Sequence, residues 1–204
     1  MKSDLSYWLF GIMGILIIAM VGGYWYSYSL HSKVTEVWKQ TLWDDCTNRM
    51  REINVKKKQI FTSETSPDIK IETEDQTLHL KENATESLTT KEKDFLADQY
   101  YLSLKNPVKI EKLDSLFRLK LKENGFTFKT AVSLYNNKTE KKTFYGEKDV
   151  KVLHDYLKLT YKVDIRDVIL LEGYVKGGWF ENLLWGKSYY YVILFIIACL
   201  ALII

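Results

Sequence analysis

The side chains that most often carry catalysis or bind metals are few in this chain, and they lie far apart. The 3 histidines, His31, His79 and His154, fall in separate segments without Cys, Asp or Glu at metal-ligand spacing. The neighbouring carboxylates of Asp44-Asp45 and of Glu74-Asp75 point apart on a helix or strand. Nucleophile-elbow, phosphate-loop and dinucleotide-binding motifs are absent. The sequence therefore predicts no catalytic residue, no metal site and no cofactor, and it leaves the ligand-binding residues unknown.

The thiols and the charges exclude two further classes of protein. Of the 2 cysteines, Cys199 lies inside an apolar block, so a disulfide with Cys46 is not expected. Cys46 is expected to be a small buried residue or, alternatively, a bridge to a second copy of the chain. Lys plus Arg number 29 against 26 for Asp plus Glu, and both signs are mixed along the middle. The one compact basic run, 56–58, predicts a solvated helix end, so no nucleic-acid partner is expected.

Two uncharged apolar blocks stand at the ends of the sequence. Residues 7–26 have the length that crosses a hydrocarbon layer of ~30 Å, with aromatic residues at both ends. The alternative for this block is a cleaved signal peptide, because Lys2 precedes it and Gly22-Gly23 lies near its end. The block at 188–204 predicts a second transmembrane helix, apparently truncated. These blocks predict a two-pass inner-membrane protein that contacts the lipid bilayer, with residues 1–6 cytoplasmic and an extracytoplasmic domain at 27–187.

Helical patterns dominate the first part of this central domain. Between residues 29 and 60, apolar residues recur every three or four positions, which predicts an amphipathic helix continuing directly from the first block. Residues 62–90 are rich in Thr, Ser and Glu and predict a loop with one or two brief strands. Thr89 or Thr90 is expected to cap a helix through about Leu104. A further helix is expected from about Ile110 to Asn124, with Gly125 as its stop.

After Gly125 the apolar period changes from helical to two, which indicates strands. We expect these strands at 126–128, 132–135, 143–145, 157–163 and 168–175. The last is the most apolar and is expected to be central in its sheet. Helices first and an antiparallel sheet afterwards predict an α+β fold class, here a domain flanked by two transmembrane helices.

The order of these elements, together with one local stretch, supplies a family resemblance. The stretch comprises Asn106-Pro107-Val108, Leu113-Asp114-Ser115-Leu116-Phe117 and Leu121-Lys122-Glu123-Asn124-Gly125-Phe126. It resembles the helix-to-strand segment in the sensor portion of bacterial membrane-bound sensor histidine kinases. The resemblance implies a PAS-like or Cache-like extracytoplasmic domain, a homodimer, and an unidentified extracytoplasmic ligand or protein. The phosphoacceptor helix and ATP-binding region of that family are absent from this sequence, so autophosphorylation is not assigned to its residues.

Two functional hypotheses follow. In the first, the chain is the signal-input region of a two-component sensor histidine kinase, which senses an extracytoplasmic cue and passes it through two transmembrane helices. In the second, it is a non-enzymatic, membrane-anchored envelope protein that binds a protein partner. Enzymatic activity stays uncertain, since no catalytic residue is identified, although a full-length relative of the first kind would be a histidine kinase.

Overall fold

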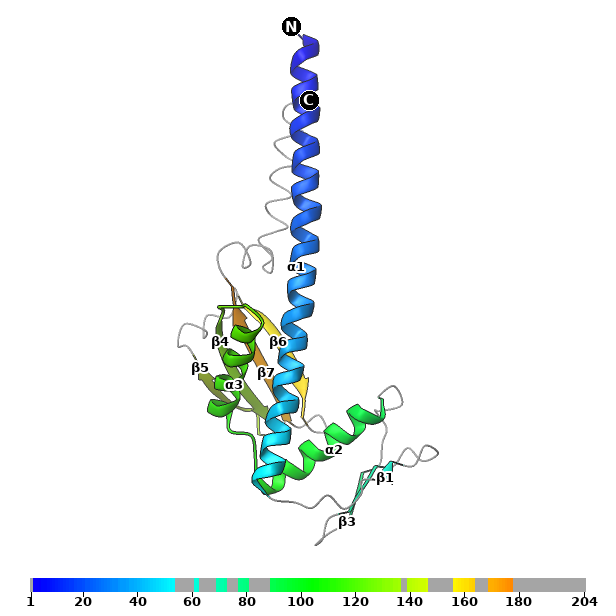
Figure 1. Cartoon of the computed structure of the whole chain (residues 1–204), viewed down its shortest axis with the longest axis vertical. Coiled ribbons are helices and arrows are strands. Elements are labelled where there is room, and N and C mark those ends of the chain that lie inside the picture. Colours follow the sequence, from blue (N-terminus) through cyan, green and yellow to red (C-terminus); the bar gives the residue numbers. More distant parts are fainter. Residues whose placement is uncertain are drawn as a thin grey trace.

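In the part of the chain that it describes, the computed structural model contains a long helix, two shorter helices and two antiparallel sheets (Figure 1). It describes residues 2–53, 61–62, 69–72, 77–80, 89–136, 139–146, 156–163 and 169–177. The helices are α1 (Lys2–Glu52), α2 (Thr90–Lys105) and α3 (Ile110–Glu123). The strands are β1 (Phe61–Thr62), β2 (Ile69–Glu72), β3 (Thr77–Leu80), β4 (Lys129–Asn136), β5 (Lys141–Gly146), β6 (Leu157–Lys162) and β7 (Ile169–Lys176).

Helix α1 is continuous over 51 residues, and its two halves have different surroundings. The C-terminal half packs against α2, α3 and the four-stranded sheet, whereas the N-terminal half extends beyond them (Figure 1). Among the α1 side chains that are described, Leu30 is the first buried one, and Val34, Trp38 and Leu42 follow on the same face. The prediction that one helix runs from the first apolar block into the domain is confirmed. The helix ends at Glu52, earlier than the expected residue 60.

The predicted membrane topology requires correction. Within the described part of the chain, no helix combines the length and the apolar character that a bilayer crossing needs. The transmembrane helix at 7–26, the two-pass inner-membrane location and the transmembrane part of the predicted fold class are therefore wrong. Residues 7–26 form no element of their own, because they are the first part of α1, whose second half is rich in charge. The other predicted crossing, 188–204, lies outside the described residues.

Local sequence signals set the ends of α2 and α3. Thr89 caps α2 in a capping box: the Thr89 backbone N–H donates to Glu92 Oε2 at 3.0 Å, and the Glu92 N–H donates to Thr89 Oγ1 at 3.4 Å. Asn106 ends this helix with its N–H bonded to the Leu102 carbonyl. Gly125, just beyond α3, has φ of +81°, a left-handed conformation that glycine adopts without a steric penalty. Both helices therefore lie where the sequence predicts them.

The larger sheet has four antiparallel strands in the order β5-β4-β7-β6, so β7 is central as predicted. The smaller sheet has the order β1-β2-β3, whereas the sequence predicted one or two brief strands in this region. One predicted strand is wrong. Residues 126–128 precede β4 and are not part of it, and the rings of Phe126 and Phe128 stack with centroids 5.3 Å apart.

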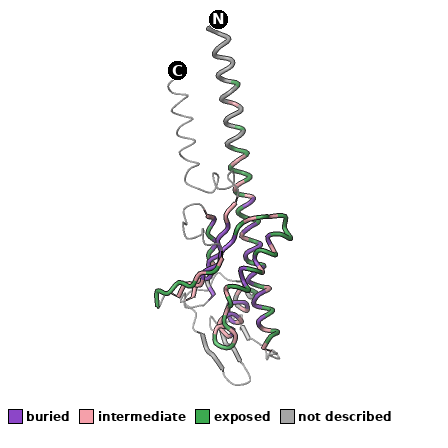
Figure 2. Tube along the Cα trace, turned by 90° about the vertical axis from the view of Figure 1, so that its left-hand side faces the viewer, coloured by how far each residue is buried: buried purple, intermediate pink, exposed green. Residues whose placement is uncertain are grey.

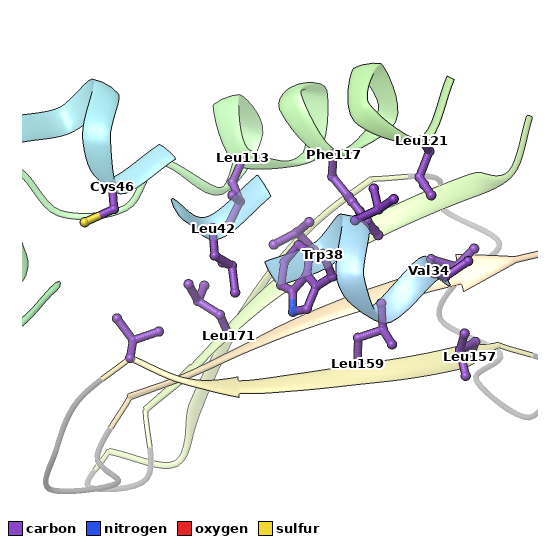
Figure 3. Packing of buried hydrophobic residues seen from close by; sticks show 14 of the residues in the cluster. Val34, Trp38, Leu42, Cys46, Leu113, Phe117, Leu121, Leu157, Leu159 and Leu171 are labelled. Atoms are coloured by element: carbon purple, nitrogen blue, oxygen red, sulfur yellow. The ribbon is translucent and has the colours of Figure 1, made fainter. Parts of the chain in front are cut away.

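The main core lies between one face of the large sheet and helices α1 and α3 (Figures 2 and 3). Its centre is Trp38, whose ring packs edge-on against the ring of Phe117 of α3, with the ring centroids 4.8 Å apart. Strand β7 accommodates this ring at Gly173, where a methyl group would lie 3.0 Å from two ring carbons of Trp38. The absence of a side chain at Gly173 thus lets α1 approach the middle of the sheet closely.

Candidate functional site

The opposite face of the same sheet carries a buried charge. Side chains alternate between the two faces of a strand, so Leu171, Gly173 and Val175 of β7 face the helices, whereas Glu172 and Tyr174 face away. Glu172 is only 5% exposed and Tyr174 only 2%. A carboxylate is rarely buried to this degree unless it is paired. The charge of Glu172 must therefore be compensated by neighbouring side chains on this face of the sheet.

Four side chains converge on the Glu172 carboxylate, and with it they form what we name the Glu172 cluster. Ser133 Oγ donates to Glu172 Oε2 at 2.9 Å, and Tyr174 Oη donates to the same oxygen at 2.5 Å. Lys142 Nζ lies 2.7 Å from Oε2, and Lys158 Nζ lies 2.5 Å from Oε1. Because Lys142 belongs to β5, Ser133 to β4, Tyr174 to β7 and Lys158 to β6, the cluster ties all four strands together.

The electrostatics of the cluster favour full ionisation. Burial alone would raise the pKa of Glu172, but the hydrogen bonds from Lys142, Lys158, Tyr174 and Ser133 outweigh it and lower the pKa to about 2. Burial would likewise lower the pKa of Lys142, yet its bonds to Glu172 and Tyr174 raise this pKa above its ordinary value. At neutral pH the cluster therefore holds a carboxylate between two ammonium groups.

The ammonium groups keep hydrogen-bonding capacity beyond this carboxylate. A lysine has three N–H donors, and the bonds described for Lys142 are to Glu172 and to Tyr174 Oη, the latter at 2.7 Å. Lys158 pairs with Glu172 alone among the described residues. The side chains of Lys142 and Lys158 are 37% and 52% exposed, so solvent reaches both. Lys176, two residues after Tyr174 on β7, places a third positive charge on the same face of the sheet, and its Nζ lies 5.3 Å from the centre of the Tyr156 ring.

This arrangement suits binding better than catalysis. Ser133 donates its proton to an ionised carboxylate of low pKa, which is a poor general base near neutral pH. The excess of ammonium groups over carboxylate instead favours an anion placed beside Lys142 and Lys158. The Glu172 cluster is therefore a candidate anion-binding site, with Glu172 as the residue that orients the two lysines.

Glu172 also adjoins the contact between sheet and helix. Gly173, the next residue along β7, is the position against which the Trp38 ring packs on the other face. A change in the position of β7 at the Glu172 cluster would therefore reach α1 through a single peptide unit and one tightly packed ring.

Among the residues that the structure describes, those singled out by sequence do not come together in a site. His31 is exposed on α1, His79 lies on β3, and His154 lies outside the described residues. Over the described residues, no group of His, Cys, Asp and Glu side chains is arranged to hold a metal ion. Cys46 is a buried core residue, as one of the two alternatives predicted, and Cys199 lies outside the described residues.

Two carboxylates that the sequence places side by side separate as expected. Asp44 pairs with Lys120 of α3, whereas Asp45 pairs with Arg49 of α1. Sequence reasoning missed Glu172, although a signal was present: it is the one charged residue within the apolar stretch 168–175.

Comparisons of this chain with protein-family models, with curated proteins and with solved structures found no match.

Proposed function

We propose that this chain is a non-enzymatic signal-input domain that binds an anionic ligand at the Glu172 cluster and passes the change to α1. The observation that carries the proposal is the adjacency of Glu172 and Gly173 on β7. Glu172 orients the lysines on one face of the sheet, and Gly173 contacts Trp38 of α1 on the helix-facing side.

The shape of α1 supports an output role for this helix. Its C-terminal half is part of the domain core, and the same uninterrupted helix continues well beyond the domain (Figure 1). A small rotation or shift of the core residues would therefore displace the distant end of α1 as a rigid rod. A ligand drives such a shift only through its difference in affinity for the two arrangements.

The resemblance to the sensor portion of histidine kinases belongs to this proposal. It adds that the response serves a two-component signalling protein and that the chain acts as a homodimer. In that setting the displacement of α1 is the input that a kinase region would receive.

Anion binding is tested by isothermal titration of the full chain with sulfate, phosphate and succinate. We expect saturable binding of at least one probe, and we expect Lys158→Ala to weaken it about tenfold, a loss of ~1.4 kcal/mol. Lys141→Ala is the matched control, because Lys141 is an exposed β5 lysine on the other face of the sheet. Binding of none of the probes, or equal loss in both variants, would contradict the proposal.

The alternative function, binding of a protein partner, is favoured by exposed apolar side chains on the helices. Trp43 of α1 is 40% exposed and stacks on Phe95 of α2 with centroids 4.6 Å apart. Leu104 of α2 is 59% exposed. Trp43→Ala separates the alternatives: it would impair capture of a protein partner and leave titration by the small anions unchanged.

A further inference from the structure

A groove of about 730 Å³ lies between the C-terminal end of α1 and helix α3, away from the Glu172 cluster. Its volume falls within the range of ~300–1,000 Å³ that is typical of small-molecule sites. Asp45 and Asn48 line it from α1, and Leu116 and Leu119 line it from α3. These four residues are spaced by three within each helix, so each pair lies on one helical face.

The floor of the groove is the buried ion pair of Asp45 and Arg49, which leaves one carboxylate oxygen of Asp45 without a hydrogen bond from the described residues. Asp45 and Arg49 are 7% and 5% exposed, and Arg49 Nε donates to Asp45 Oδ2 at 2.7 Å. The rest of the guanidinium is committed to α2 and its end, through Gln99 Oε1 at 2.6 Å and the Asn106 carbonyl at 3.1 Å. Within the described part of the chain, Asp45 Oδ1 accepts no hydrogen bond, and Asp45 is one of the residues that line the groove.

The rim offers positive charge and the wall offers apolar surface. Arg51 is exposed and makes no ion pair with the described residues. Lys112 Nζ forms an ion pair with Glu52 Oε1 at 3.2 Å, and the Lys112 side chain is 62% exposed. Leu119, at 52% exposed, provides apolar contact area together with Leu116. The groove thus presents the Asp45 carboxylate at its floor, Arg51 and the Lys112–Glu52 pair at its rim, and hydrocarbon along its side.

We propose that this groove binds a small zwitterion with an apolar portion. Its ammonium group meets Asp45 Oδ1, its carboxylate meets Arg51 and Lys112, and its hydrocarbon part contacts Leu116 and Leu119. Glu52 also lines the groove but already pairs with Lys112, so a ligand with only a positive charge would leave the charge of Arg51 uncompensated. A ligand with only a negative charge would face Asp45. A zwitterion satisfies both ends, and the inference is independent of the anion site on the sheet.

Three matched probes test this proposal: leucine, 3-methylbutylamine, which lacks the carboxylate, and 4-methylpentanoate, which lacks the amine. Isothermal titration of the full chain should show saturable binding of leucine, with each single-charge analogue at least about tenfold weaker, since each forfeits one charged contact. No saturable leucine binding, or equal binding of the three probes, would overturn the proposal.

Variants locate the site. Asp45→Asn should weaken leucine binding at least about tenfold. Asp44→Asn is the control and should leave leucine binding unchanged, because the Asp44 carboxylate pairs with Lys120. Because Asp45→Asn also removes a buried partner of Arg49, exposed Arg51→Ala provides a second variant, with an expected loss of about threefold to fivefold. Leucine affinity that is unchanged in Arg51→Ala would overturn the assignment. Lys158→Ala should not alter leucine binding, so this site and the sheet-face site fail or succeed separately.

Discussion

The two faces of the large sheet differ in how they bury side chains, although they share the same strands. On the helix-facing side, Gly173 leaves just enough room for the Trp38 ring, and the contacts are apolar. On the other side, Glu172 is held by two lysines and two hydroxyl groups. The apolar face loses stability with any change in volume, whereas the ionic face can exchange partners with solvent. One strand thus combines a rigid contact with an adaptable one.

The largest effect is expected from Trp38→Ala, which empties the centre of the apolar face. Trp38 is 1% exposed, so the change should lower the free energy of unfolding by about 3–5 kcal/mol. Urea denaturation measures this loss. Trp38→Phe is the control, because Trp38 Nε1 has no hydrogen-bond partner among the described residues and phenylalanine keeps most of the ring. A loss below ~1 kcal/mol in Trp38→Ala would show that α1 does not depend on this contact.

Gly173→Ala tests the same contact from the sheet. The added methyl group would lie 3.0 Å from the Trp38 ring, closer than carbon atoms approach without strain. We expect a loss of about 1–3 kcal/mol in urea denaturation. Gly22→Ala is the matched control, since a methyl group there meets no atom within 4 Å, and alanine in a helix is favoured by ~0.5–1 kcal/mol. Equal stabilities of the two variants would contradict close packing at Gly173.

Glu172→Gln tests the ionic face, and we expect a loss of about 1–2 kcal/mol at pH 7. The pKa of Glu172 is about 2 in the folded protein against an ordinary 4.5, so its contribution is present above pH 4.5 and is lost as the pH falls toward 2. Unfolding experiments across this range should show a decline that is smaller in Glu172→Gln. Parallel pH profiles for the two proteins would show that the lysines do not stabilise the ionised carboxylate.

The smallest effect is expected from Lys120→Ala on the surface between α3 and α1. Lys120 Nζ lies 2.8 Å from Asp44 Oδ2, and the Asp44 side chain is 46% exposed. Exposed pairs contribute little, so the loss should be about 0.5 kcal/mol and should fall further in high salt. Thermal unfolding at two salt concentrations measures it. A loss as large as that of Glu172→Gln would remove the distinction between buried and exposed ion pairs in this fold.

Local signals predicted most of the elements but not how they assemble. The Thr89 cap, the stop at Gly125 and the alternation in 157–163 each depend on neighbouring residues, and the corresponding elements are found. The strand expected at 126–128 failed because alternation alone does not tell a paired strand from an extended segment whose rings stack on each other. The transmembrane helix expected at 7–26 failed for a different reason: these residues are the first part of α1, and in the described part of the chain no helix is long and apolar enough to cross a bilayer.

The candidate site could be predicted only in part. Glu172 stands out as a charge within an apolar stretch, but three of its four partners, Lys158, Lys142 and Ser133, come from other strands, 14 to 39 residues away in the sequence. The pairing of Ser133 with Glu172 depends on the register of β4 against β7, which no local pattern specifies. The α1–α3 groove likewise depends on the packing of two helices that are distant in sequence.

Coupling of the anion site to α1 is tested most directly by a distance between spin labels at Glu36→Cys on α1 and Lys141→Cys on β5, in a Cys46→Ala, Cys199→Ser background. Both label positions are exposed. We expect a saturating anion, chosen by titration, to shift the mean distance by about 1–2 Å, as helix displacements of this kind do. We also expect Lys158→Ala to abolish the shift at the same anion concentration. An unchanged distance in a protein whose anion site is shown to be filled would contradict coupling between the anion site and α1.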